Sequence, residues 1–327
     1  MGTKQGSRSE QVTPSRKNAV RRRFQIQGLF SMRVFVTGAS GYTGAHVCAA
    51  LRECGHKVVA LVRPSSDLGL LRSVAGPVDV AVAANSADVA VAFGKALPQA
   101  VIHLAADYPG ATAPDDIAGL IDVNVIFGTA LVEAMLAAGC TKLVTAGTNW
   151  QYYNGPCELP NSLYAATKSA FRTICDYYAA LRGLACTELR LFDSYGPADP
   201  RGKLLDLLTQ AASTGQVLDM TPGEQVIYPI HVFDTASAFV HALTEEAAPP
   251  PGMVASWSVP GPEALTLKEM VGMLSDVLGV AVPVTWGARP YPPGQIMQPY
   301  IGTVLPGWQP ELALAEGLRM VFGSHVS

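Results

Sequence analysis

Residues 34–44 read Val-Phe-Val-Thr-Gly-Ala-Ser-Gly-Tyr-Thr-Gly, and this stretch is the most informative part of the sequence. An apolar run passes directly into glycines at positions 38, 41 and 44, and an Ala-rich segment, His46 to Glu53, follows at once. The pattern predicts a strand, a tight turn and a helix. Small residues let such a turn approach a pyrophosphate, and the N-terminus of the new helix offers unpaired N–H groups. A tight turn that binds nothing is the alternative.

The composition is that of a globular protein, with either one large hydrophobic core or more than one. The chain has 327 residues, of which 49% are hydrophobic and 15% are charged. This is enough apolar material for packed interiors and too little charge for a disordered chain. No run approaches the roughly 20 consecutive apolar residues of a membrane span, so we expect no membrane-embedded segment.

Charge is distributed unevenly along the chain. Residues 1–31 carry seven Lys or Arg residues and one Glu, whereas the whole chain has a net charge of −3. Such a tail could contact nucleic acid or anionic lipid, or could act as a transit peptide. Because the first predicted strand begins right after Met32, we expect a disordered basic leader without function and no nucleic-acid or membrane partner.

The cysteines indicate a reducing compartment. They lie at positions 48, 54, 140, 157, 175 and 186, with no C-x-x-C and no paired spacing. This pattern is typical of reduced thiols and argues against a zinc site. No apolar secretion signal accompanies the basic leader. We therefore expect a cytoplasmic protein without a metal centre.

Predicted strands and helices alternate along the first half of the chain. We expect strands at 57–62, 78–83, 100–106 and 142–146, and helices at 88–97 and 114–138. This alternation predicts an α/β fold with a doubly wound parallel sheet and right-handed connections. Ligands bind such sheets at the carboxyl ends of the strands, where we expect the Gly38 turn, Arg63, Ala105-Ala106 and Thr148 to meet. His103 lies within an apolar run and is expected to be a buried core residue.

Arg63 bears on the choice of cofactor. In dinucleotide-binding folds that use NAD, an acid about 20 residues after the glycines binds the adenosine ribose, whereas an Arg suits a 2′-phosphate. Here Arg63 follows the second predicted strand, and the first acid is Asp67. We therefore favour NADP(H) over NAD(H). The alternative is that Arg63 is a solvated loop cation.

Tyr164 and Lys168 form the constellation that carries chemistry. Their i, i+4 spacing brings both side chains to one face of a predicted helix. A cation beside a phenolate favours ionisation, so we expect Lys168 to lower the pKa of Tyr164 and make it a usable acid or base. Thr148, at the end of the preceding strand, can hydrogen-bond a substrate oxygen and hold it near Tyr164.

These motifs resemble those of the extended short-chain dehydrogenases/reductases of the NAD-dependent epimerase/dehydratase kind. The chain contains their T-G-x-x-G-x-x-G from Thr37, their Y-x-x-x-K at Tyr164, and a Thr at the position of their third catalytic residue. The likeness extends from Met32 to about Met320. It implies a Rossmann-type fold and hydride transfer at the nicotinamide, with Thr148, Tyr164 and Lys168 catalytic. The expected cofactor-binding residues are Gly38, Ser40, Gly41, Tyr42, Thr43, Gly44, Arg63, Ala105, Ala106 and Lys168.

Several segments also resemble the CDP-abequose and CDP-paratose synthases, which reduce a 4-keto sugar nucleotide with NADPH. The segment Leu189 to Pro197 resembles the family's R-L-F-N-V-Y-G-P, except that Asp193 replaces the usual Asn. A carboxylate repels a pyrophosphate unless it is turned away or paired, so this departure weakens the role carried over from the family. The expected substrate-binding residues are Asn149, Asp193, Arg201, Lys203 and Arg289.

The residues after Thr148 help to choose the reaction. Related dehydratases carry an Asp-Glu pair there, whereas this chain has Asn149 and Trp150, which cannot serve as acid and base for elimination. We therefore expect an NADPH-dependent 4-ketoreductase acting on a deoxy sugar nucleotide. An epimerase with retained cofactor uses the same triad and stays open. A non-catalytic dinucleotide-binding protein is a third alternative, which the intact triad disfavours.

The resemblance also implies a domain organisation and a dimer. We expect a dinucleotide-binding domain at residues 32–195 with a returning segment at about 226–247. A smaller α/β substrate domain then comprises residues 196–225 and 248–327, with loops at 248–262 and 287–299. Family members pair the helices that correspond to residues 115–138 and 164–182 across a two-fold axis, so we expect a homodimer.

Overall fold

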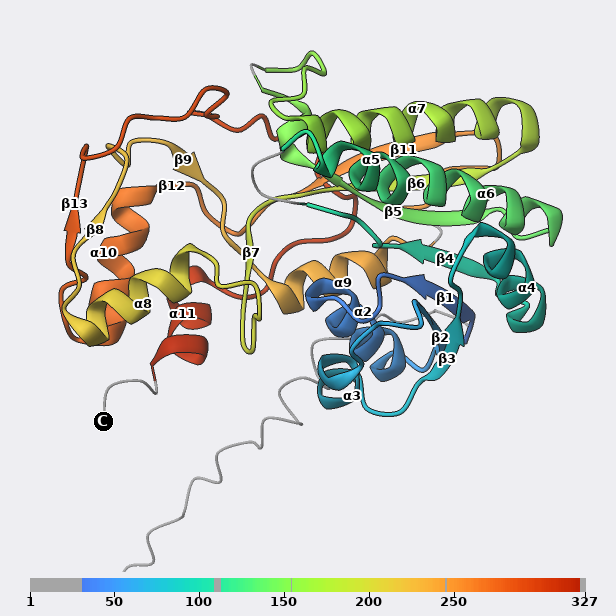
Figure 1. The fold of residues 1–327 in the computed structure, drawn as a ribbon, viewed down its shortest axis with the longest axis horizontal. Helices are drawn as coiled ribbons and strands as arrows, with labels where there is room; N and C mark the ends of the chain where they lie inside the picture. Colours follow the sequence, from blue (N-terminus) through green and yellow to red (C-terminus); the bar gives the residue numbers. More distant parts are fainter. Residues whose placement is uncertain (1–30, 109–112, 154, 245, 324–327) are drawn as a thin grey trace, which may run out of the picture.

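The computed structural model describes residues 31–108, 113–153, 155–244 and 246–323. The predicted leader therefore lies outside the described residues except for Ser31, whose hydroxyl donates to Gly55 O. Figure 1 shows a large part built on one sheet and a smaller lobe beside it.

A seven-stranded parallel sheet forms the centre of the large part. The strand order is β11-β6-β5-β4-β1-β2-β3, and every neighbouring pair is parallel. The strands are β1 (Arg33–Thr37), β2 (Lys57–Val62), β3 (Asp79–Val82), β4 (Ala100–His103), β5 (Lys142–Thr148), β6 (Ala185–Leu191) and β11 (Val254–Val259). The order reverses between β1 and β4, which creates the crevice where such sheets bind ligands. The predicted doubly wound sheet is confirmed.

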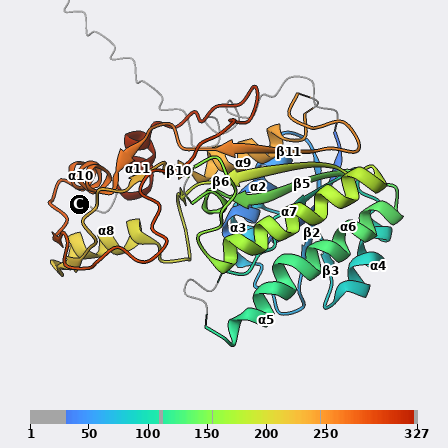
Figure 2. The ribbon, with the colours of Figure 1, turned by 90° about the horizontal axis from the view of Figure 1, so that it is seen from above.

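Helices cover both faces of this sheet (Figures 1 and 2). One layer consists of α2 (Tyr42–Glu53), α3 (Gly69–Ala75) and α9 (Val232–His241). The other consists of α4 (Ser86–Ala96), α5 (Asp116–Ile121), α6 (Phe127–Ala137) and α7 (Leu163–Arg182). A π-helical turn, η1 (Asp122–Ile126), joins α5 to α6 within what the sequence predicts as one helix.

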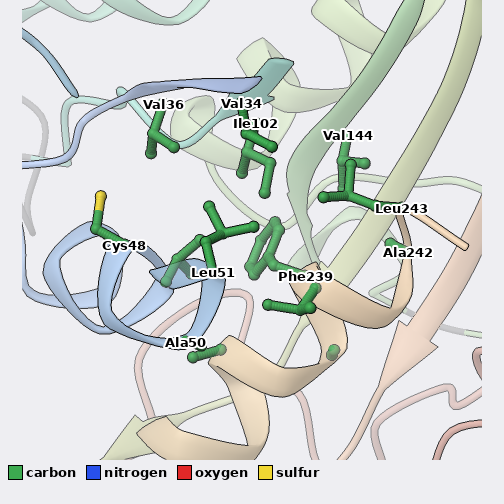
Figure 3. Packing of buried hydrophobic residues seen from close by; sticks show 14 of the residues in the cluster. Val34, Val36, Cys48, Ala50, Leu51, Ile102, Val144, Phe239, Ala242 and Leu243 are labelled. Carbon is green, nitrogen blue, oxygen red and sulfur yellow. The ribbon is translucent and has the colours of Figure 1, made fainter. Parts of the chain in front are cut away.

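Alternation along β1 divides the core between the two layers. Val34 and Val36 point to one face, where they join a buried cluster with Leu51 of α2 and Phe239 of α9 (Figure 3). Phe35 points to the other face and meets Phe93 of α4 at 5.2 Å between ring centres. Burying one such side chain stabilises the fold by about 1.5–3 kcal/mol. The apolar run before the glycines therefore anchors the turn from both sides.

The smaller lobe has a core of its own. Its elements are α8 (Leu204–Thr214), α10 (Leu267–Leu278), α11 (Leu314–Phe322), β8 (Leu218–Asp219), β9 (Val226–Ile227), β12 (Leu265–Thr266) and β13 (Val284–Thr285). Leu208, Leu274 and Leu318 are completely buried in it. Two short paired strands, β7 (Ser194–Tyr195) and β10 (Ile230–His231), connect this lobe to the large part.

Some boundaries differ from the sequence prediction. Helix α2 begins at Tyr42, directly after the extended Gly41, so Thr43 and Gly44 lie in its first turn. Strand β4 ends at His103, and Ala105-Ala106 follow it outside the strand. The predicted loop at 248–262 is wrong for Val254–Val259, which pairs with β6 at the edge of the sheet. Prolines on both sides of this strand led to the loop prediction. Because the strand belongs to the large sheet, it lies outside the smaller lobe to which residues 248–327 were assigned.

One helix in the described part of the chain, Asp116–Ala137, is long and apolar enough to cross a membrane by length and composition alone. Leu131 and Met135 on this helix are completely buried between the sheet and its neighbours. These two apolar side chains of the helix are therefore explained by packing inside the protein.

Candidate functional site

The glycine turn closes tightly over the end of β1. Gly38 has a positive φ of 67°, and a Cβ at this position would lie 2.6 Å from Ala105 N. A Cβ on Gly44 would lie 2.1 Å from Gly38 O, so α2 can start this close to the strand only with glycine there. Glycine thus lets the backbone of the turn pack directly against the loop after β4 and against the start of α2, whose N-terminus can face a pyrophosphate.

Thr37 ties the glycine turn to the end of β4. Its Oγ1 lies 2.7 Å from His103 Nδ1 and accepts the Ala105 N–H at 3.2 Å. His103 is buried against Phe127 and Phe171, and burial, together with the Lys168 charge, lowers its pKa to about 3. The prediction that His103 is a core residue is confirmed, and the imidazole is neutral at ordinary pH.

A cleft of about 630 Å³ runs along the carboxyl ends of β1, β2 and β4. Six predicted cofactor-binding residues line it: Gly38, Ser40, Gly41, Arg63, Ala105 and Ala106. Ser66 lines it as well and accepts the Arg63 backbone N–H at 3.0 Å. The volume, the open glycine turn and the position at the strand reversal fit a dinucleotide.

Thr148 ends β5 and begins a short turn, η2 (Asn149–Gln151). Its hydroxyl oxygen accepts the Trp150 N–H at 3.3 Å, and its own N–H donates to Gln151 Oε1 at 2.7 Å. Thr148 is only 8% exposed, and its hydroxyl proton has no acceptor among the described residues. A buried hydroxyl of this kind can donate to a substrate oxygen.

Helix α7 presents Tyr164 and Lys168 in its first two turns, after Ser162 caps its N-terminus. Lys168 is buried, with Nζ 5.7 Å from the centre of the Tyr164 ring. Burial lowers the pKa of Lys168 to about 8, while the charge of Glu188 acts in the opposite direction.

The expected lowering of the tyrosine pKa is wrong for the protein by itself. Burial, followed by the neighbouring Tyr108, raises the pKa of Tyr164 to about 12. Desolvation of the phenolate outweighs the attraction of a lysine at this distance. Tyr164 is therefore protonated at neutral pH and suited to donating a proton.

Two further aromatic rings surround Tyr164. Tyr108 lies 5.0 Å from Tyr164 and 5.8 Å from Trp150 between ring centres, and Trp150 lies 6.4 Å from Tyr164, all edge-to-face. The sequence suggested no role for Tyr108, and for Trp150 it indicated only that this residue cannot act as an acid or base. Only the fold brings together these residues, which follow two different strands.

Trp150 also borders a second cavity, of about 260 Å³, between the sheet and the smaller lobe. Three of the predicted substrate-binding residues, Asn149, Asp193 and Lys203, line this cavity. Gln225 and Tyr228 line it too and were not predicted, because their loop carries no motif that the sequence analysis used. The cavity is mostly apolar, with carboxylates close to the single lysine.

Other predicted residues lie elsewhere. The Arg201 guanidinium is bound to the Asp199 carboxylate, with Nε 2.7 Å from Oδ1, and stacks 4.5 Å above the Tyr42 ring. The buried Tyr42 side chain thus faces Arg201 and does not line the dinucleotide cleft. Arg289 is exposed and lines neither cavity described above.

Asn124 is a buried polar residue that the sequence analysis missed. It lies in the π-helical turn, where its amide exchanges hydrogen bonds with the Asp107 backbone, at 2.7 and 3.1 Å, and donates to Thr167 Oγ1 at 3.0 Å. It therefore links the loop after β4 to the helix that carries Tyr164 and Lys168. An Asn within an otherwise apolar helix was the available signal.

Comparison with known proteins agrees with this geometry. The model of the NAD dependent epimerase/dehydratase family matches residues 34–255. CDP-abequose synthase of Yersinia pseudotuberculosis is 25% identical over 250 residues, which is 75% of this chain and 84% of that protein. UDP-glucose 4-epimerase of Mycolicibacterium smegmatis is 27% identical over 310 residues, covering 88% and 96%.

Solved structures show the same fold. The crystal structure of a UDP-glucose 4-epimerase from Thermotoga maritima with UDP-glucose superposes with a TM-score of 0.77 at 22% identity, covering 89% of this chain and 97% of that one. The Thermus thermophilus UDP-glucose 4-epimerase in complex with NAD gives a TM-score of 0.74 at 25% identity, covering 90% and 98%. Because the family match spans more than half of the sequence, the chain belongs to the NAD-dependent epimerase/dehydratase family of extended short-chain dehydrogenase/reductase enzymes.

Proposed function

We propose that this enzyme reduces the 4-keto group of a deoxy sugar nucleotide, using NADPH. The observation that carries the proposal is the grouping at Tyr164: a protonated phenol, a buried lysine and two aromatic rings, one of which, Trp150, lines a mostly apolar cavity. The similarity to CDP-abequose synthases supports the same reaction.

Different residues of the chain have separate roles in such a reduction. When bound, NADPH supplies the hydride that reduces the ketone carbon. Thr148 donates its hydroxyl proton in a hydrogen bond to the keto oxygen and orients it. Tyr164 then transfers its phenolic proton to that oxygen as negative charge develops, and Lys168 stabilises the phenolate that remains and holds the nicotinamide ribose. An alkoxide is more basic than this phenolate, so the transfer is favourable.

The aromatic rings support reduction over epimerisation. An epimerase returns hydride to the opposite face of the same carbon, so the sugar ring has to turn over within the site. Tyr108 and Trp150 narrow the space beside Tyr164. A sugar that lacks hydroxyls presents C–H groups that pack well against such rings. The similarity of this chain to UDP-glucose 4-epimerases, including the Mycolicibacterium smegmatis protein, supports the epimerase alternative.

The charged residues of the cavity suggest how the substrate is oriented. We assign Lys203 to the diphosphate, and burial together with the Arg201 charge lowers the pKa of this lysine. The Asp193 carboxylate accepts no hydrogen bond from any described residue, so we assign it to sugar hydroxyls, from which a carboxylate accepts hydrogen bonds well. Arg201, held by Asp199, and the distant Arg289 have no part in this arrangement.

The preference for NADPH rests on the loop after β2. Arg63 and Ser66 both line the cleft at the position expected for the adenosine ribose. Asp67 is occupied, because its Oδ1 accepts the Gly69 N–H at 2.8 Å. A guanidinium and a hydroxyl can bind a 2′-phosphate, whereas no free carboxylate from this loop lines the cleft to bind a 2′-hydroxyl.

We further propose a homodimer through α5, α6 and α7, which lie side by side on one outer layer (Figure 2). Large apolar side chains are exposed along these helices and the η1 turn between α5 and α6, including Ile126 at 53%, Tyr177 at 55% and Leu181 at 70%. A second copy would bury these residues. Light scattering should give twice the chain mass for the wild type and the monomer mass for Leu181→Glu. A monomeric wild type would refute the dimer.

Because all six cysteines are free thiols, we propose that the enzyme works in the cytoplasm.

Product analysis tests the reaction. With a panel of 4-keto-6-deoxy sugar nucleotides, we expect one equivalent of NADPH to be consumed for each reduced product. Conversion of an unreduced sugar nucleotide into its epimer, without net change in the cofactor, would establish the epimerase alternative. A preference for NADH would refute the role of Arg63.

A further inference from the structure

Glu188 is a buried carboxylate that the reaction described above does not use. It lies on β6, opposite Thr145 of β5 and Ser256 of β11, and is 2% exposed. Cys186, two residues earlier on the same face, packs with Cys175 and Phe171 of α7. Glu188 therefore points toward α7, the helix that carries Tyr164 and Lys168.

Both oxygens of this carboxylate accept hydrogen bonds. Ser256 Oγ donates to Oε2 at 2.7 Å, and Gln151 Nε2 donates to Oε1 at 3.2 Å. Gln151 is completely buried, and its own carbonyl accepts the Thr148 N–H at 2.7 Å. A continuous chain of hydrogen bonds thus runs from Ser256 through Glu188 and Gln151 to the backbone of Thr148.

Gly147 shows how closely this chain is packed. A Cβ at this position would lie 2.8 Å from both Gln151 Oε1 and Glu188 Oε1. Glycine is required here because the two side chains meet directly above the backbone of β5. The arrangement fixes the turn in which Thr148 lies.

The negative charge of the Glu188 carboxylate also favours the protonated form of Lys168. Several titratable groups surround this lysine: Glu188 on β6, His103 on β4 and Tyr164 on the same helix. His103 and Tyr164 are neutral at ordinary pH, for the reasons given above. Among the residues that the structure describes, Glu188 is the charged group that favours the protonated lysine. Burial raises the pKa of Glu188, while the hydrogen bonds from Ser256 and Gln151 and the charges of Arg172 and Arg190 act in the opposite direction and favour its carboxylate form.

We propose that Glu188 is a positioning residue that acts in two directions, through Gln151 on the Thr148 turn and across the sheet–helix interface on Lys168. Removing its charge should make the protonated lysine less favourable, and releasing Gln151 should loosen the hydroxyl that orients the ketone. The inference rests on the roles proposed above for Thr148 and Lys168.

The first test measures NADPH binding as a function of pH, by fluorescence of the reduced nicotinamide, and needs no ketone. Wild-type binding should weaken as the pH rises past the pKa of Lys168. In Glu188→Gln this weakening should occur at a pH lower by roughly half a unit or more. Glutamine keeps the shape; its carbonyl can still accept from Gln151 and its amide can donate to Ser256 Oγ, so the charge is lost while both contacts are kept.

Glu158→Gln is the matched control. Glu158 Oε1 also accepts from Gln151 Nε2, at 3.3 Å, but this carboxylate does not act on Lys168. Its binding curve should coincide with that of the wild type. If the Glu188→Gln curve also coincides, or if both variants shift equally, the charge effect is refuted. Should Glu188→Gln fail to fold, Ser256→Ala removes one donor from the carboxylate and should shift the curve in the same direction by less; no shift would refute the charge effect.

The second test addresses the Thr148 turn. Gln151→Met keeps the volume but removes the acceptor of the Thr148 N–H; at a pH below the pKa of Lys168, where this lysine stays protonated, we expect kcat to fall by roughly 10- to 100-fold with NADPH binding unchanged. An unchanged kcat would refute this part of the inference. A wild type that binds NADPH normally but reduces no ketone would refute the proposed function while leaving the first test valid.

Discussion

The phenol rings of Tyr108 and Tyr164 meet edge-to-face, with ring centres 5.0 Å apart and planes inclined at 65°. One ring follows β4 in the chain and the other begins α7. Tyr108 is half exposed, whereas Tyr164 lies further inside. Tyr164, the proposed proton donor, therefore has an aromatic neighbour that a substrate can contact and that, after burial, also helps to keep the pKa of Tyr164 high.

Tyr164→Phe should abolish proton donation without disturbing this packing. We expect kcat to fall by roughly 10²- to 10⁴-fold, as is usual when a general acid is removed, and NADPH binding to stay within about twofold of the wild type. Turnover and cofactor fluorescence measure the two effects separately. Retention of wild-type turnover would remove Tyr164 from the catalytic role.

Trp150→Ala should weaken the binding of deoxy sugars in particular. A lost aromatic contact costs about 0.5–1.5 kcal/mol beyond the area it buries, so we expect KM for a 4-keto-6-deoxy sugar nucleotide to rise roughly tenfold. Tyr108→Ala should act in the same direction, and Tyr108→Phe, which keeps the ring, is the control. Equal losses for 6-deoxy and 6-hydroxy substrates would contradict a role in selectivity.

Arg63→Ala should reduce the preference for NADPH. A hydrogen bond between charged partners contributes about 1.5–3 kcal/mol, so the Kd of NADPH should rise roughly 10- to 100-fold while that of NADH changes little. Lys57→Ala, which removes an exposed cation at the start of the same strand, is the control. If the two cofactors lose affinity equally, Arg63 does not bind the 2′-phosphate.

His103 should make the fold sensitive to acid. Its pKa is about 3 in the folded protein and about 6.5 when unfolded, so between these values the unfolded state binds one more proton. Stability should therefore fall as the pH drops below 6.5, by about 1.4 kcal/mol per pH unit from this residue. His46, with a pKa lowered by burial to about 4, adds a second contribution.

Urea denaturation at several pH values checks this dependence. His103→Asn keeps a hydrogen-bonding group for Thr37 but removes the titration. Its stability should fall less steeply below pH 6.5, by the equivalent of one proton. Equal slopes for wild type and variant would show that His103 does not carry the effect.

The sequence predicted the sheet well because its strands are short apolar runs between clear turn signals. It failed at Val254–Val259, where prolines flank the strand and Ser256 and Ser258, which donate hydrogen bonds to Glu188 and Ile301 O, interrupt the apolar pattern. Local patterns carry no information about partners that are distant in the chain.

The candidate site was predictable where the chemistry is local. The glycine turn and the pair Tyr164 and Lys168 each lie within one short segment. The aromatic neighbours of Tyr164 and the contact between Glu188 and Gln151 join residues from separate strands, so they emerge only from the fold. The direction of the Tyr164 pKa depended on burial, which no spacing reveals.

Deuterium transfer from the cofactor distinguishes the proposed reduction from epimerisation. The enzyme would be given a 4-keto-6-deoxy sugar nucleotide and NADPH carrying deuterium at C4 of the nicotinamide, in separate reactions for each of the two stereochemical positions. Net reduction predicts that one of the two samples delivers one deuterium to the sugar carbon of every product molecule. Interconversion of sugar nucleotides with no deuterium lost from the added cofactor would contradict the account and identify an epimerase.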